Sequence, residues 1–214
     1  MNIFRGRSNT RRQVSACVAF SLLAATPTLG GNQAFYSVFV DTSTISGTTG
    51  LLDFQFDPSS PLAQFGFAEI LNFTGGSLIP PPSITGDVSG ILPGIIILNN
   101  DTPINEYREG ITFGPNIIFD LLLAGPAVSN PGPLPFGSLF GLSLFNSAGA
   151  VELTSNPAGQ LFTVSVNPGG TTTVTTYSPF VTVTPEPASV LLFFTAAAML
   201  GAALIKRKRH TPPV

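Results

Sequence analysis

The middle of this chain has almost no cations, no cysteine and no histidine. Across residues 35–184 the only basic side chain is Arg108, whereas the other basic residues and the one histidine, His210, lie near the two ends. Nucleic-acid binding needs a basic stripe, because neutralising phosphates supplies most of its affinity, so nucleic acid is excluded as a partner. The only cysteine, Cys17, precedes this body, which therefore forms no disulfide and no cysteine-ligated metal site.

The lack of these residue types also excludes most kinds of catalytic site. Without histidine, lysine or cysteine, the body has no Ser-His-Asp or Cys-His nucleophilic site, no histidine-bound zinc and no lysine-based reaction. Carboxylate pairs, as in glycoside hydrolysis, are the catalytic option that remains. The sequence gives no reason to pair any two of the available acids, which are Asp53, Glu69, Glu106, Glu109 and Asp120.

Tryptophan is absent and tyrosine is scarce, which matters for carbohydrate binding. Sugar-binding platforms usually stack an aromatic ring on the sugar, with Trp and Tyr favoured for their polar groups. The body offers only Tyr36, Tyr107 and Tyr177 for that role. Most of the 18 phenylalanines alternate with polar neighbours, so we predict that they form the core rather than a binding strip.

Oxygen-bearing side chains are abundant by contrast. Residues 35–184 hold ten acids against one arginine, a net charge of minus nine. Such ligands are dense between Asn99 and Glu109, and calcium takes about six to eight oxygen ligands, so Asp101, Glu106 and Glu109 are candidate calcium ligands. No EF-hand spacing is present, and a polar turn in which Arg108 pairs with a neighbouring acid is the favoured interpretation.

The hydrophobic period of the body is two, which predicts strands. Strands are expected at 36–40 and 52–56, and a third has Phe65, Phe67, Leu71 and Phe73 on one face. Glu69 falls on that same face, so we expect a bulge near Gly66 to reset the register. Further strands are predicted at 95–98, 111–113, 117–123, 138–146, 151–154 and 161–166, with 171–184 as either a last edge strand or a stalk. Short strands separated by turn residues predict an all-β domain at 35–184, an antiparallel β-sandwich of jelly-roll type.

Residues 1–34 have the three parts of a secretory signal peptide. Arg5, Arg7, Arg11 and Arg12 precede a short apolar stretch, and small residues follow it. We expect cleavage between residues 26 and 34 and export of the remainder. An amphipathic or core helix is the alternative, but arginines directly before a short apolar run favour the signal peptide.

A second apolar segment, residues 188–205, is long enough to cross a bilayer as a single transmembrane helix. Its eighteen residues carry no charge, and at about 1.5 Å per residue a helix of this length covers roughly 27 Å. The tail at 206–214 begins with a basic stop-transfer cluster, which the positive-inside rule keeps in the cytoplasm with the basic N-terminus, so the body lies outside. The cluster consists of Lys206, Arg207, Lys208 and Arg209.

Pro185, Glu186 and Pro187 stand directly before this segment. Pro-Glu-Pro, a spanning segment and a basic cluster within a short distance together resemble, over residues 185–214, the PEP-CTERM sorting signal of Gram-negative and related bacteria. The resemblance implies recognition of the tripeptide by an exosortase, an integral-membrane transpeptidase-like enzyme, and a link to exopolysaccharide production. Because each proline disfavours helix in the residue before it, we expect 184–187 to be extended and unpaired. An ordinary C-terminal anchor stays open as the alternative.

The body is also similar to an uncharacterised group of PEP-CTERM proteins, through short runs at 36–42, 52–56, 86–90 and 106–114. This resemblance brings no known activity. Together the features predict a non-enzymatic exported protein of the cell surface or extracellular matrix, structural or adhesive and associated with exopolysaccharide. A calcium-assisted carbohydrate-binding module is the second hypothesis, and a carboxylate-dependent glycosidase is the third.

Overall fold

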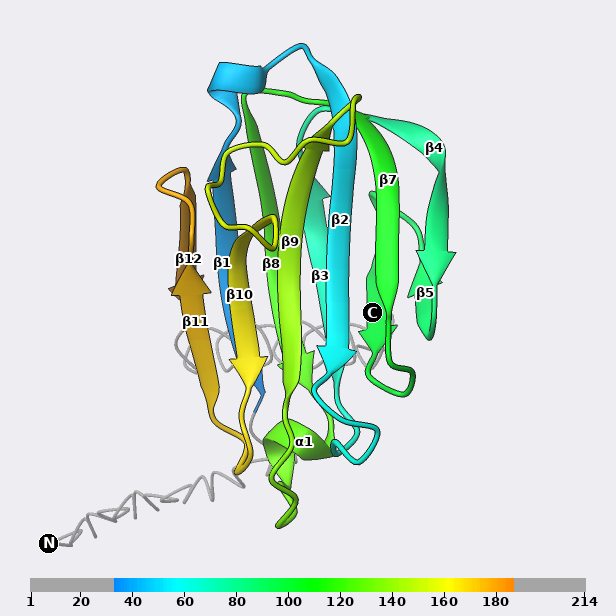
Figure 1. The fold of residues 1–214 in the computed structure, drawn as a ribbon, viewed down its shortest axis with the longest axis vertical. Helices are drawn as coiled ribbons and strands as arrows, with labels where there is room; N and C mark the ends of the chain where they lie inside the picture. Colours follow the sequence, from blue (N-terminus) through cyan, green and yellow to red (C-terminus); the bar gives the residue numbers. More distant parts are fainter. Residues whose placement is uncertain (1–32, 187–214) are drawn as a thin grey trace, which may run out of the picture.

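A computed structural model of the chain describes residues 33–186, which form twelve strands and two short helical turns (Figure 1). The predicted signal segment before residue 33, the predicted spanning segment and the basic tail lie outside the described residues. In chain order the elements are β1 (Ala34–Asp41), the 3-10 helix η1 (Ser43–Ile45), β2 (Thr49–Pro58), β3 (Phe67–Thr74), β4 (Ser77–Thr85), β5 (Val88–Gly90), β6 (Ile96–Asn99), β7 (Glu106–Thr112), β8 (Asn116–Ala124), α1 (Pro126–Ser129), β9 (Ser138–Asn146), β10 (Gln160–Val166), β11 (Thr172–Thr176) and β12 (Val181–Pro185).

The strands form two six-stranded sheets that pack face to face. Sheet A has the order β12-β1-β8-β3-β6-β5, and sheet B, in front in Figure 1, has the order β11-β10-β9-β2-β7-β4. Neighbouring strands are antiparallel throughout. Gly75 and Gly76 alone join β3 in one sheet to β4 in the other, with positive φ angles of 145° and 55° that favour glycine. The predicted antiparallel β class with two packed sheets is confirmed.

The core lies between the sheets and follows from the alternation of side chains along each strand. On β2 the side chains of Leu52, Phe54 and Phe56 point inward and are almost completely buried. The ring of Phe54 meets Phe119 of sheet A edge-on, with 5.3 Å between the ring centroids, and meets Phe73 at 6.5 Å. One aromatic residue of sheet B therefore contacts two from sheet A, so both sheets share one core.

Strand β3 contains a bulge, but not where the sequence predicted it. The pairing with β8 shifts around Asn72, whose φ is 53°, rather than near Gly66. Ala68 faces the core before the shift, so Phe67 and Glu69 lie half-buried on the outer face of sheet A. The predicted inward face was wrong for the first half of the strand, and Glu69 is not a core acid.

Residues 171–184 form neither a single edge strand nor a stalk. They divide into β11, at the edge of sheet B, and β12, at the edge of sheet A, with Pro179 in the turn between them. The predicted strand at 151–154 is a loop, in which one bridge joins Val151 to Phe145. Strands β4 and β5 were not predicted, and each lies at a sheet edge.

Both ends of the described chain lie at one end of the sandwich, which we call the terminal pole. Strand β1 begins there and β12 ends there, because Tyr36 pairs with Pro185 and the amide of Glu186 donates to the carbonyl oxygen of Phe35 at 2.8 Å. The strand directions place three long connections at the same pole, with α1 at the bottom of Figure 1. These are the β2–β3 loop at 59–66, the β6–β7 loop at 100–105 and the β8–β9 segment at 125–137.

Candidate functional site

The structure does not bring together the three predicted calcium ligands. Asp101 is exposed in the β6–β7 loop, Glu106 is half-buried on the outer face of sheet B, and Glu109 is buried in the core with 2% of its surface exposed. A strand sends side chains three positions apart to opposite faces, which separates Glu106 from Glu109. Within residues 33–186, no group of three or more acidic, histidine or cysteine side chains is placed to hold a metal ion.

The β6–β7 loop is held in place by a buried asparagine, Asn105. The backbone amide of Asn105 donates to Oδ1 of Asp57 at 2.7 Å. Its side-chain Nδ2 donates to the carbonyl oxygens of Phe56 at 3.1 Å and Thr102 at 2.7 Å. These hydrogen bonds fasten the loop to the end of β2, so the amide side chain braces the fold and is not free to bind a ligand.

Glu109 is hydrogen-bonded inside the core. The hydroxyl of Tyr107 donates to Oε2 of Glu109 at 2.5 Å and accepts from the amide of Leu92 at 3.0 Å. Burial raises the pKa of Tyr107, which keeps the hydroxyl protonated as a donor. The three groups tie β7 of sheet B to the β5–β6 connection of sheet A, which is a structural role.

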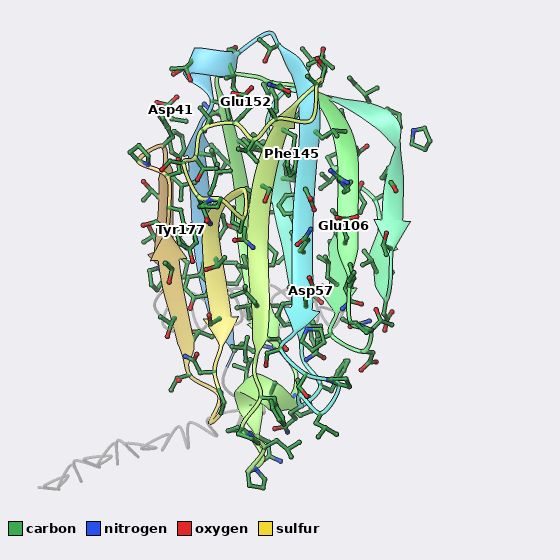
Figure 2. All side chains as sticks on the ribbon, in the orientation of Figure 1. Asp41, Asp57, Glu106, Phe145, Glu152 and Tyr177 are labelled. Atoms are coloured by element: carbon green, nitrogen blue, oxygen red, sulfur yellow. The ribbon has the colours of Figure 1, made fainter. Side chains whose placement is uncertain are left out.

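Acids do come together on the outer face of sheet B, in a group that we call the Asp53 cluster. Asp53, Gln55 and Asp57 alternate along β2, while Glu106 and Arg108 alternate along the neighbouring β7. Nε2 of Gln55 donates to Oε1 of Glu106 at 3.1 Å and to Oδ2 of Asp53 at 3.4 Å, so one amide group links the two carboxylates. Figure 2 labels Asp57 and Glu106 on these two strands.

Asp53 is the buried member of the cluster, with 5% of its side chain exposed. Its pKa is raised to about 7, mainly by burial and next by the Glu106 carboxylate, while Arg108 opposes both effects. Nε of Arg108 lies 3.6 Å from Oδ2 of Asp53. Within the described part of the chain, that Nε and the other carboxylate oxygen of Asp53 have no hydrogen-bond partner.

The guanidinium group of Arg108 also lies over an aromatic ring. Its central carbon is 5.4 Å from the ring centroid of Phe145, a cation–π distance, and 36% of the side chain is exposed. The partly exposed groups of the cluster are Arg108, Gln55 and Glu106, which offer hydrogen-bond donors and acceptors. Of these, Arg108 lies over the half-buried ring of Phe145, whereas Gln55 lies opposite Gly141 of β9. A ligand rich in hydroxyl groups suits this arrangement chemically.

The geometry favours binding over catalysis at this face. An acid with a pKa near 7 beside a second carboxylate is what a glycosidase needs, but Asp53 is too buried to reach a glycosidic oxygen. The other acids considered from the sequence do not join this cluster. Glu69 and Asp120 lie on the outer face of sheet A, where Asp120 accepts from Ser37 at 3.0 Å and from Asn72 at 2.7 Å.

The three tyrosines that the body offers as possible stacking platforms do not lie beside the cluster. Tyr107 is fully buried, and Tyr36 is 4% exposed with its hydroxyl donating to Thr172. Tyr177 is exposed in the turn between β11 and β12, away from β2 and β7. The aromatic ring at the cluster is Phe145 instead, which the sequence did not single out.

The predicted sorting motif begins inside sheet A. Thr184 pairs with Ser37 and Pro185 pairs with Tyr36, and the amide of Glu186 also bonds to β1. The prediction that 184–187 is extended is confirmed as far as Pro185, but the prediction that it is unpaired was wrong, because β12 continues as an edge strand into the motif. Pro187 and the basic cluster from Lys206 to Arg209 lie outside the described residues.

Comparison with family models, curated proteins and solved structures finds no match for the chain. No helix within residues 33–186 has both the length and the apolar character needed to cross a membrane.

Proposed function

We propose that the chain is an exported bacterial envelope protein whose β-sandwich has a structural or adhesive role at the cell surface or in extracellular polymer. Residues 1–34 act as the signal peptide, 188–205 as a transmembrane helix, and 185–214 as a PEP-CTERM-type sorting signal that an exosortase recognises at Pro185, Glu186 and Pro187. One observation carries this proposal. Strand β12 ends at Pro185 and the amide of Glu186 still bonds to β1, so Pro187 alone separates the folded domain from the apolar run that starts at Ala188.

The architecture supports a domain carried on a surface by one end. The first and last strands are neighbours in sheet A, so entry and exit of the chain share the terminal pole and the rest of the sandwich projects away from it. Most consecutive strands lie in different sheets, which supports the jelly-roll-like description and interlocks the two layers. Such a module suits a passive load-bearing or adhesive role.

Mass spectrometry of the C-terminus tests the sorting proposal. The full chain is produced in two matched strains of a bacterium, one with its exosortase and one without it. We expect loss of residues 190–214 only where the enzyme is present, and retention of the intact end when Glu186→Gln is introduced. Glu152→Gln, in the loop at the opposite pole, is the matched control and should be processed normally. An intact C-terminus in both strains would leave an ordinary membrane anchor.

The pairing of Pro185 with β1 suggests a second version of this experiment. A Gly-Ser-Gly-Ser insertion between Thr184 and Pro185 preserves the tripeptide but releases it from its pairing with β1. Because an enzyme needs an accessible extended segment, the insertion should speed processing. The same insertion in the turn after Asn167 should leave the rate unchanged.

The Asp53 cluster favours carbohydrate binding as a second function. Arg108 presents donors beside the Phe145 ring, and the half-buried Gln55 and Glu106 present a donor and acceptors further along the same face, which together form a suitable surface for sugar hydroxyls. Retention of residues 33–186, which contain both sheets and their core, is measured on gels of the producing organism's exopolysaccharide. We expect Glu106→Gln and Arg108→Gln to reduce retention at least tenfold, and Glu69→Gln on the other sheet to leave it unchanged. Parallel measurements with calcium and with chelator test whether the metal takes part. Equal retention of the unchanged domain and all variants would exclude carbohydrate binding by the Asp53 cluster.

A further inference from the structure

The terminal pole exposes four large apolar side chains at the tips of its loops. Leu62 is 62% exposed, Ile104 is 55%, Leu134 is 42% and Phe65 is 39%. They come from three different loops, at 59–66, 100–105 and 125–137. Away from this pole, the loops within the described residues expose Val151 and Tyr177, each at 41%, and the β5–β6 connection exposes Ile91 at 53% and Ile95 at 52%. We call the four residues at the terminal pole the apolar tips.

Hydrogen bonds of Asn100 and Gln64 fix the three loops relative to one another. Nδ2 of Asn100 donates to the carbonyl oxygen of Gln64 and to the hydroxyl of Ser138, both at 2.8 Å. Its Oδ1 accepts from the amide of Gly66, also at 2.8 Å. Nε2 of Gln64 in turn donates to the carbonyl oxygen of Asn130 at 2.9 Å. The tips therefore belong to one braced surface, and binding against it costs little ordering of the loops.

The length of chain beyond the sheet limits how far this surface can lie from a bilayer. Only Pro187 separates Glu186, which is bonded to β1, from the apolar run that begins at Ala188. One residue extends the chain by at most about 3.6 Å. A protein inserted through that run would hold the terminal pole within a few ångströms of the membrane surface.

We propose that the terminal pole docks on the outer surface of the bilayer, with the apolar tips inserted at the boundary between headgroups and acyl chains. This inference rests on the proposed membrane-inserted precursor. Leu62, Phe65, Ile104 and Leu134 supply the apolar contact, and the braced loops keep the sandwich upright. The domain then meets the membrane as a fixed body, which sets the height of the sorting motif above the lipid.

The negative charge at this pole determines which lipid headgroups favour or oppose docking. Asp101 is exposed in the same loop as Ile104, and Asp57 and Asp87 lie at the same end of the sandwich. The one cation among the described residues, Arg108, is paired with Asp53. Docking is therefore driven by apolar insertion, and anionic lipids oppose it.

Quenching by lipid-borne nitroxides tests the docking. The full chain, with Cys17→Ser, is placed in phosphatidylcholine vesicles containing doxyl-labelled lipid, and a polarity-sensitive fluorophore is attached at Pro103→Cys or at Tyr177→Cys. We expect at least fivefold stronger quenching at position 103 than at position 177, with weaker quenching at 103 when phosphatidylglycerol is added. Equal quenching at both positions in chain that floats with the vesicles would overturn the docking while leaving the anchor intact. Chain that does not float would overturn the anchor as well.

A set of substitutions separates apolar insertion from simple proximity. Replacing Leu62, Ile104 and Leu134 by serine should reduce quenching at position 103 to the level seen at position 177, although the chain still floats. Serine at Phe39 and Ile118, which pair with each other on the outer face of sheet A and are 42% and 41% exposed, is the matched control and should change nothing. Unchanged quenching in the triple variant would show that the tips do not insert.

Discussion

Asp53 is a single residue whose contribution to stability depends on pH. Its pKa is about 7 in the folded protein against an ordinary value of 3.8, mainly because of burial and then because of Glu106. Between these two values the folded state binds more protons than the unfolded state, so the contribution of Asp53 falls as the pH rises from about 4 to 7. The raised pKa of Asp57, which is also due to burial, acts in the same direction.

We therefore expect Asp53→Asn to gain stability relative to the unchanged protein as the pH rises. A shift of about three pKa units sets the limit of this relative gain at about 4 kcal/mol between pH 4 and pH 8. Urea unfolding at pH 4, 6 and 8 measures it. Asp41→Asn is the control, because hydrogen bonds from Ser43 lower the pKa of Asp41 and no such gain should appear. Parallel pH profiles for Asp53→Asn and the unchanged protein would contradict the prediction.

At the scale of the element, β2 could be predicted from the sequence and β4 could not. The alternation of Leu52, Phe54 and Phe56 with polar residues is a local pattern, and it predicted β2 correctly. Strand β4 carries the prolines at 80–82 and buries none of its residues, so it has no apolar pattern to detect. Its prolines are tolerated because β4 pairs with β7 alone, at the edge of sheet B.

The candidate site depends on pairing between elements, which the sequence does not carry locally. Asp53 and Glu106 were both considered as acids, but their meeting depends on β7 lying beside β2 with Gln55 opposite Glu106. The separation of Glu106 from Glu109, in contrast, follows from the period of any strand. If the sequence had predicted the start of β7 at residue 106 rather than at 111, Glu106 and Glu109 would have been assigned to opposite faces of the strand.

At the scale of the whole molecule, the shared core makes the two sheets one cooperative unit. Phe54 of sheet B contacts Phe73 and Phe119 of sheet A, so Phe54→Ala should cost about 3–5 kcal/mol and reduce the hydrogen-exchange protection of both sheets together. Phe39→Ala, at a site 42% exposed on the outer face of sheet A, should cost less than about 1 kcal/mol. Faster exchange confined to sheet B would show that the sheets unfold separately.

The neighbouring ends of the described chain also make this sandwich suitable for insertion, as a whole domain, into another protein. Phe35 and Glu186 are joined by a hydrogen bond of 2.8 Å, so a host protein could accept the whole domain within one of its loops without spreading that loop apart. For the same reason, a short tether could close the two ends and new ends could be opened in the long loop at 147–159. The chain ends of the permuted domain would then leave it at the opposite pole, and its core would be unchanged.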